Sequence, residues 1–276
     1  MIRLIATDMD GTLLARDHVT ISPRNRSALR AASDQGVRIV LASGRPWCFV
    51  RESVEALGCV DYAILCNGAG TRAVAEGAWL DRDGLEEPVW RRLFGMLRQT
   101  GAPFLTYSDG EAYLERAVLD EMGRHFSLSP EFQRTAERVV TLVDTLEEAL
   151  AGRRVEKIDS FFVPEAVRAS LREELASIPG LYVASGLSDN LEISSAAADK
   201  GRSLARLCAR LGIAREEVMA FGDGGNDVEM LRWAGCSFAM ENGMDCARGA
   251  AGQIAPSHQE DGVGRMVERY VLRPEA

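Results

Sequence analysis

Carboxylates gather at two places in the chain, each directly after a short apolar run. Asp8-Met9-Asp10-Gly11-Thr12 follows the run 2–7, and Gly222-Asp223-Gly224-Gly225-Asn226-Asp227 follows the run 218–221. If both runs are strands of one open α/β sheet, both groups of carboxylates lie at its carboxyl edge, where ligands bind. Aspartate and glycine also favour ordinary turns, so a polar turn after each strand is the alternative interpretation.

Asp8, Asp10, Asp223 and Asp227 would repel one another if they shared one crevice. A hard divalent cation with oxygen ligands removes that repulsion, and Mg²⁺ suits phosphate chemistry. The spacing of an EF-hand calcium loop is absent. The carboxylates therefore predict a Mg²⁺ site, with a plain capped turn at 222–227 as the alternative.

Two further segments add groups that could bind phosphate. Ala42-Ser43-Gly44-Arg45 follows another apolar run, so the Ser43 hydroxyl and nearby backbone amides could bind a phosphate oxygen. Ser43 could equally be the N-cap of the next helix. Lys200 follows Asp199 at the start of a helical pattern and could neutralise a phosphoryl group, although a lone lysine is more often solvated.

The elements that would position these residues alternate between strand and helix at both ends of the chain. Short apolar runs at 2–7, 37–41, 62–66, 218–221 and 237–240 are separated by helical patterns at 23–35, 46–57, 200–211 and 226–234, with a last one at 261–271. This alternation predicts an α/β fold, a Rossmann-like three-layer core with a parallel sheet covered on both faces.

The middle of the chain has a different pattern. Apolar runs at 104–107 and 111–114 flank Ser108-Asp109-Gly110, which indicates a hairpin. Further strand candidates lie at 155–163, 182–184 and 191–193, among helical patterns at 86–99, 144–150 and from Pro164 onward. We therefore expect an inserted α+β cap domain with an antiparallel sheet at 83–187, between two core segments at 1–82 and 188–276.

Composition limits the classes of partner. The formal net charge is −9 and the pI about 5.1, which disfavours nucleic acid. No apolar run approaches the roughly 20 residues that span a bilayer.

The six cysteines form no Cys-x-x-Cys pair, which favours reduced thiols in a cytoplasmic protein. His18, His125 and His258 lack metal-ligand spacing, so we interpret them as structural or incidental.

The motifs together resemble those of the haloacid dehalogenase superfamily, and specifically its Cof-type phosphatases with a type IIB cap. Four motifs match in order: the segments at 8–12, 43–45 and 200–201, and the long one at 222–231. Asn67-Gly68-Ala69 and Asp261-Gly262-Val263 also match subfamily signatures. The resemblance covers essentially the whole chain.

The resemblance implies a role for each carboxylate. Asp8 would attack phosphorus and form an aspartyl-phosphate, and Asp10 would act as general acid and then as general base. The Asp8 carboxylate, the Asp10 backbone carbonyl and Asp223 would hold Mg²⁺, with Asp227 supporting the metal site. An aspartate at position 10 favours a phosphatase, because superfamily dehalogenases lack an acid there and transport ATPases carry threonine.

The resemblance also implies the phosphate contacts. Ser43, Gly44 and Lys200 would hold the phosphoryl oxygens, and Asn226 would orient Lys200 or the phosphate. Arg45 and Asn67 are candidate contacts to the leaving group, with local hydrogen bonding as the alternative for both.

The predicted function is Mg²⁺-dependent hydrolysis of a small phosphorylated metabolite, either a sugar phosphate or a phosphorylated cofactor. A phosphomutase or phosphotransferase on the same core is one alternative, and a non-catalytic binding module is another. We expect a monomer or a weak homodimer with no nucleic-acid or membrane partner.

Overall fold

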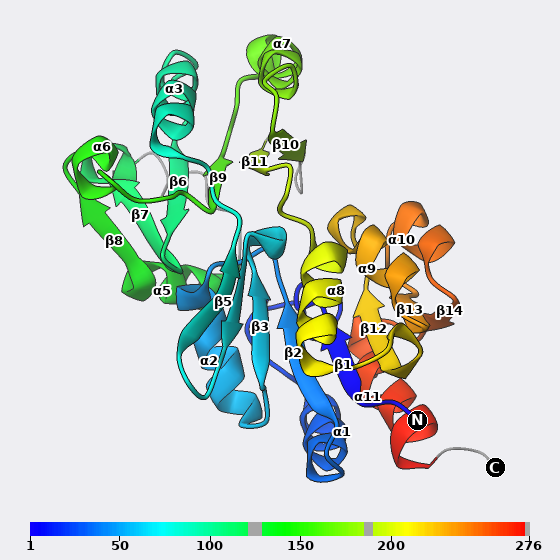
Figure 1. Ribbon diagram of the computed structural model, residues 1–276. Coiled ribbons are helices and arrows are strands. Elements are labelled where there is room, and N and C mark those ends of the chain that lie inside the picture. Colours follow the sequence, from blue (N-terminus) through cyan, green and yellow to red (C-terminus); the bar gives the residue numbers. More distant parts are fainter. Residues whose placement is uncertain (121–128, 185–189, 274–276) are drawn as a thin grey trace.

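The computed structural model describes residues 1–120, 129–184 and 190–273, which form two sheets with helices packed on them (Figure 1). The larger sheet has eight strands in the order β14-β13-β12-β1-β2-β3-β4-β5. In that order they are Gln253–Ala255, Cys236–Met240, Val218–Gly222, Leu4–Thr7, Arg38–Ala42, Tyr62–Leu65, Gly70–Ala73 and Ala78–Arg82. The first six strands pair in parallel, and β4 and β5 add an antiparallel hairpin at one edge.

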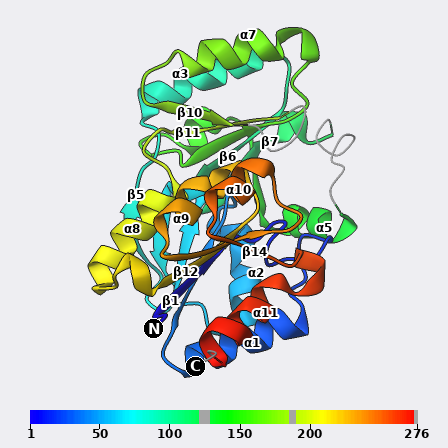
Figure 2. The same ribbon diagram turned by 90° about the vertical axis from the view of Figure 1, so that its right-hand side faces the viewer.

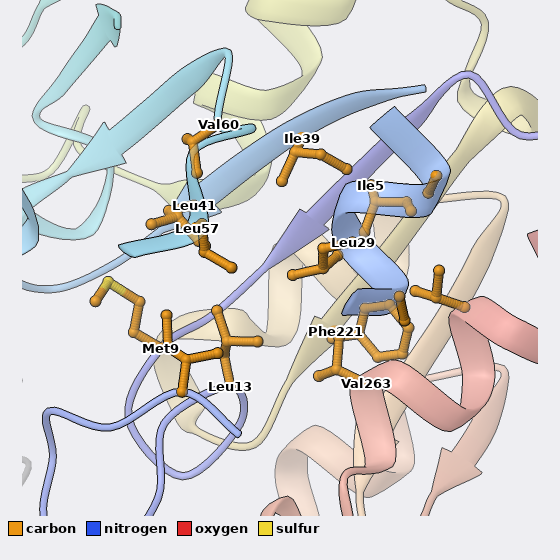
Figure 3. Close-up of a cluster of buried hydrophobic side chains, with 14 of the residues drawn as sticks. Ile5, Met9, Leu13, Leu29, Ile39, Leu41, Leu57, Val60, Phe221 and Val263 are labelled. Atoms are coloured by element: carbon orange, nitrogen blue, oxygen red, sulfur yellow. The ribbon is translucent and has the colours of Figure 1, made fainter. Parts of the chain in front are cut away.

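Helices cover both faces of this sheet because its strands are apolar on both sides. In β1, Ile5 packs with α1 (Pro23–Asp34), α2 (Trp47–Leu57) and α11 (Gly262–Val267), as the close-up in Figure 3 shows for several of these residues. Its neighbours Leu4 and Ala6 point to the other face. There they pack with α8 (Lys200–Leu211) and α9 (Val228–Trp233). The predicted three-layer α/β core is confirmed.

The smaller sheet has six strands in the order β10-β11-β9-β6-β7-β8. In that order they are Leu181–Ala184, Leu191–Ser195, Lys157–Ser160, Phe104–Ser108, Glu111–Glu115 and Val140–Val143. All neighbours pair antiparallel except β7 and β8, which pair in parallel. The predicted turn at Asp109-Gly110 joins β6 to β7, and both turn residues have positive φ, as a tight hairpin turn requires.

The helices of the smaller sheet lie mainly on the face turned away from the larger sheet (Figure 2). There α3 (Glu87–Arg98) and α7 (Glu165–Ala176) pack their apolar side chains against Phe104, Ile158 and Ile193. The segment that forms the smaller sheet also contains α5 (Pro130–Val139) and α6 (Leu146–Ala149). A further helix, α10 (Asp245–Ala250), packs on the larger sheet.

Several elements in the structure are shorter than the sequence predicted, and the smaller sheet extends beyond the expected inserted segment. We expected the inserted segment to end at residue 187, but β11 lies beyond that point and pairs with β9 and β10 in the smaller sheet. The predicted strand at 155–163 is only β9, and α5, β8, β14 and the β4–β5 hairpin were not predicted. His125 and residues 185–187 of the expected cap lie outside the described residues. Within the described part of the chain, no helix has the length and apolar character needed to cross a membrane.

The contact between α8 and α9 gives a test of the packing. A Cβ at Gly201 would lie 2.5 Å from the carbonyl carbon of Glu229 and 2.8 Å from the backbone nitrogen of Met230. The backbones of α8 and α9 would have to move apart to make room for this Cβ. We therefore expect Gly201→Ala to lower the free energy of unfolding by about 2 kcal/mol in urea denaturation.

Gly95, inside α3, is the matched control, because a Cβ there would meet no atom within 4 Å. Gly95→Ala should raise the free energy of unfolding by about 0.5–1 kcal/mol, since alanine is the better helix former. Equal stability of the two variants would contradict the close packing of α8 on α9.

Candidate active site

Lys200 is the fully buried centre of the site, at the first residue of α8. Its Nζ donates to Asp8 Oδ1 at 2.6 Å and to Asp227 Oδ1 at 2.7 Å. Burial alone would lower the pKa of Lys200, but the two carboxylates outweigh burial and raise it above its ordinary value. The ammonium group therefore stays charged and joins the end of β1 to the loop after β12.

Two backbone features place Lys200 beside Asp8 and Asp227. Asp199 caps α8, and its side chain accepts a hydrogen bond from the Arg202 backbone N–H at 2.7 Å. Gly68 has φ 98°, and a Cβ there would lie 2.4 Å from the Asp199 carbonyl oxygen. Only glycine permits this approach, so the signature Asn67-Gly68 has a packing role at the start of α8.

Asp227 organises the loop that follows β12. Its Oδ2 accepts hydrogen bonds from the backbone N–H groups of Asp223 and Gly224, both at 2.9 Å. Its other oxygen accepts from Lys200, so both oxygens of this fully buried carboxylate have partners. Thr12 Oγ1 donates to Asp223 Oδ1 at 3.1 Å and ties the loop after β1 to the same place.

Asp8, Asp223 and Asp227 offer carboxylate oxygens that lie within 4.8 Å of one another. Burial, and then the charge of Asp227, raises the pKa of Asp223 to about 6. Burial also raises the pKa of Asp8 well above its ordinary value, although Lys200 opposes the shift. Three clustered carboxylates around one ammonium group carry excess negative charge, so their oxygens fit a divalent cation.

The side chain of Asp10 lies in a separate ion pair. Its carboxylate accepts from Arg45 Nε at 2.8 Å and Nη2 at 2.5 Å, and lies 2.8 Å from Nδ1 of His18. Burial would raise the pKa of Asp10, but Arg45 and His18 outweigh it and lower the pKa to about 2. Asp10 is therefore ionised at neutral pH in this arrangement, and His18, which we interpreted as incidental, belongs to the site.

Arg45 also contacts the smaller sheet's helix α5. Its guanidinium lies 4.8 Å from the centre of the Phe132 ring, and Phe132 stacks on Phe49 of α2 at 5.4 Å. Ser129, the N-cap of α5, donates to the Asp17 carbonyl at 2.5 Å. One arginine therefore contacts both the Asp10 carboxylate and a helix from the other half of the molecule.

Of the remaining predicted residues, Ser43 and Asn67 are buried beside the end of β2. Ser43 Oγ accepts from the Arg45 backbone N–H at 3.1 Å, which leaves its hydroxyl proton available to a ligand. Asn226 Nδ2 donates to Asn67 Oδ1 at 2.9 Å, so Asn226 contacts Asn67 instead of Lys200. A Cβ at Gly44 would lie 2.9 Å from that same oxygen.

A cavity of about 570 Å³ lies over these residues and reaches the smaller sheet. From the core it is lined by six of the predicted site residues, namely Asp8, Asp10, Gly44, Arg45, Asp223 and Asn226. Its other wall includes polar residues of the smaller sheet that the sequence did not indicate as site residues, namely Tyr107, Lys157, Asp159 and Glu192. For Lys157 and Asp159, the signal that could have found them is a charged residue on either side of Ile158 in the short strand β9.

A hydrogen bond between side chains joins the core to the smaller sheet beside this cavity. Asn67 Nδ2 donates to Glu192 Oε2 at 3.1 Å, across a separation of 125 residues. We predicted Asn67 as a candidate contact to the leaving group, with local hydrogen bonding as the alternative. The structure gives it partners on both sides of the cavity.

Comparison with known proteins identifies the family. A profile of the haloacid dehalogenase-like hydrolases matches residues 5–267. The chain belongs to this family.

Several similar proteins are phosphatases, and the match to each extends over nearly its whole length. The chain is 28% identical to the 5-amino-6-(5-phospho-D-ribitylamino)uracil phosphatase YcsE of Bacillus subtilis (strain 168), covering 98% of this chain and 96% of that protein. It is 26% identical to the pyridoxal phosphate phosphatase YbhA of Escherichia coli (strain K12), covering 98% and 99%. A solved sugar phosphatase of HAD subclass IIB has the same fold, with a TM-score of 0.80 and 23% identity over 96% of this chain and 98% of that one.

These findings confirm the predicted Cof-type membership of the haloacid dehalogenase superfamily and the predicted enzyme class, a phosphoric monoester hydrolase. The cluster of Asp8, Asp223 and Asp227 is in keeping with the divalent metal that hydrolases of this family generally use.

The buried ion pairs of Lys200 should contribute to the stability of the fold. Lys200→Met removes the ammonium group and leaves two buried carboxylates without their shared partner. We expect it to lower the free energy of unfolding by about 3–5 kcal/mol in urea denaturation at neutral pH.

Arg202→Met is the control for Lys200→Met, because Arg202 is an exposed residue of the same helix. It should change the free energy of unfolding by no more than about 0.5 kcal/mol. If the two variants were equally stable, the buried ion pair would not contribute as described.

Proposed function

We propose that this hydrolase is a Mg²⁺-dependent phosphatase of small phosphorylated metabolites, either sugar phosphates or phosphorylated cofactors, and that it acts through an aspartyl-phosphate on Asp8. The observation that carries the proposal is the position of Asp8, which lines the cavity while Lys200 holds one of its oxygens and two more carboxylates lie beside it. The similar phosphatases, named for a ribitylaminouracil phosphate and for pyridoxal phosphate, support this class of substrate.

In the first half of the reaction, a carboxylate oxygen of Asp8 attacks phosphorus, and the bond from phosphorus to the leaving oxygen breaks. Asp10 gives its proton to that oxygen, so the leaving group departs as an alcohol. The Ser43 hydroxyl, the backbone N–H of Gly44 and the Lys200 ammonium group hold the phosphoryl oxygens, and Asn226 orients the phosphate from the cavity wall. Lys200 also stabilises the charge that develops on the transferring group.

In the second half, Asp10 takes a proton from water, and the water oxygen attacks phosphorus. The bond between phosphorus and Asp8 breaks, which releases inorganic phosphate and restores the Asp8 carboxylate. The contacts of Asp10 with Arg45 and His18 suit this base role, because they keep its carboxylate ionised. Asp10 must leave that ion pair before it can protonate the leaving oxygen in the first half.

The residues that would hold Mg²⁺ are Asp8 and Asp223 through their carboxylates and Asp10 through its backbone carbonyl, with Asp227 supporting the site through the loop after β12. When bound, Mg²⁺ neutralises charge on the phosphoryl group and on the Asp8 carboxylate.

We propose further that the smaller sheet and its helices act as a cap that excludes water and selects the substrate. The cap would comprise the inserted residues from about 83 to the end of β11, between the two core segments. For the whole chain we propose a cytoplasmic location, a monomer or weak homodimer, and no nucleic-acid partner, in keeping with the net charge of −9.

Phosphate release from a panel of small phosphomonoesters tests the reaction. With Mg²⁺, the wild type should release phosphate, and EDTA should abolish the release. Asp8→Asn should lower the rate by at least about 1000-fold, because an amide is a poor nucleophile. Asp144→Asn, at an exposed position in the cap, should keep the wild-type rate.

Two results would contradict the proposed reaction. Substantial phosphate release by Asp8→Asn would remove Asp8 as the nucleophile. Rearranged substrate without free phosphate would indicate a phosphomutase instead.

Thermal unfolding tests the metal site independently of activity. Mg²⁺ at a hundredfold excess over its dissociation constant should raise the melting temperature of the wild type by about 5 °C, because it binds the folded chain. Asp223→Ala should lose this shift, since it removes one of the clustered carboxylates. Glu76→Ala, at an exposed turn, should keep it. The proposed site would be wrong if the wild type showed no shift.

A further inference from the structure

The cap face of the cavity carries charged side chains because of the strand alternation in β9 and β11. Ile158 and Ile193 pair in register and point toward α3 and α7, where they belong to the apolar core of the cap. Their neighbours Lys157, Asp159 and Glu192 therefore point the other way, and all three line the cavity. The face that meets the core thus carries two carboxylates and one ammonium group from these strands.

Lys157 holds the two carboxylates in fixed positions. Its Nζ donates to Asp159 Oδ2 at 2.9 Å and to Glu192 Oε2 at 3.2 Å, and its side chain is only 5% exposed. Tyr107 OH donates to the same Asp159 oxygen at 2.8 Å. The carboxylates therefore cannot turn freely toward solvent, and their remaining oxygens have set positions.

One oxygen of Glu192, a residue that lines the cavity, has no protein donor in the described part of the chain. Glu192 uses only Oε2, which accepts from both Asn67 and Lys157, and Oε1 accepts from no protein group of the described ranges. Asp159 Oδ1 also has no partner among the described residues, but it is sealed from solvent, so a ligand in the cavity cannot reach it. An acceptor without a protein donor in a confined site favours a ligand that brings a donor.

Glu192 is also fixed relative to the phosphoryl site. Asn67 donates to Glu192 and accepts from Asn226, which stands next to Asp227 in the loop of the carboxylate cluster. This chain of two amides crosses from the core to the cap. The distance between a phosphoryl group at Asp8 and the free acceptor of Glu192 is therefore set by the fold.

We propose that Glu192 determines specificity by accepting hydrogen bonds from hydroxyl or amino groups on the leaving group, while Lys157 and Asn67 position it. This inference rests on the proposed phosphatase function and narrows its substrates to phosphomonoesters whose leaving group carries hydrogen-bond donors. An ester with an apolar leaving group would fill the same space but leave this acceptor unpaired, which sites of this kind reject strongly.

The test compares two esters with five-carbon chains, ribitol 5-phosphate and n-pentyl phosphate, which differ only in their hydroxyl groups. With Mg²⁺, the wild type should hydrolyse ribitol 5-phosphate with a kcat/KM at least about 100-fold higher. In Glu192→Gln the ratio should fall below about 10, because the glutamine oxygen keeps Asn67 and Lys157 as donors but the neutral amide loses the charge-assisted hydrogen bond from the substrate hydroxyl groups. Glu76→Gln makes the same change at an exposed turn and should keep the wild-type ratio.

Inhibition by the free alcohols gives a second measurement that needs no variant. Ribitol should inhibit competitively, and 1-pentanol at the same concentration should not. Equal kcat/KM values for the two esters, an unchanged ratio in folded Glu192→Gln, or equal inhibition by both alcohols would overturn the inference and leave the phosphatase function standing. Failure to release phosphate from either ester, or from the wider panel, would overturn both.

Discussion

The buried ion pair of Lys200 with Asp8 and Asp227 is the interaction on which the rest of the site depends. A fully buried ammonium group is stable only when carboxylates surround it, and those carboxylates come from segments more than 200 residues apart in sequence. The chain must therefore bring the ends of β1 and β12 side by side and press the start of α8 against them. The parallel pairing of β1 with β12 meets the first requirement. Glycines at 68 and 201, which let backbones approach, meet the second.

The same charge balance suits the proposed binding of a cation and then of an anion. Lys200 neutralises only part of the charge of Asp8, Asp223 and Asp227. Burial, and then the charge of Asp227, raises the pKa of Asp223 to about 6. A divalent cation would reverse the sign of the local field, and a phosphoryl group could then bind beside carboxylates that would otherwise repel it. An acidic protein can in this way bind an anionic substrate.

The sequence predicted the core of the site because strand-to-loop motifs need only a parallel sheet to bring them together. Asp8 and Asp223 were predicted in this way, whereas Lys200 was predicted from its place at the start of a helical pattern and from the family motif. His18, Lys157 and Glu192 were not, because their roles arise from contacts that depend on how a loop folds back or how the cap docks. The expected end of the inserted segment at residue 187 lies before β11, which pairs in the smaller sheet, because β11 leads almost directly into α8 and no change in composition marks that point.

The smaller sheet and its helices meet the core through an apolar cluster that includes Phe49 and Leu105, and polar side chains connect the two parts beside the site. Asn67 links the phosphate loop to Glu192, and Arg45 contacts both Asp10 and Phe132 of α5. A displacement of α5 would remove the aromatic face from Arg45, and a displacement of Arg45 would release Asp10 from its ion pair. In the proposed reaction Asp10 leaves that pair to protonate the leaving oxygen, so Arg45 would couple the position of the cap to the protonation of Asp10. Under that proposal, substrate selection and proton transfer would depend on the same docking of cap to core.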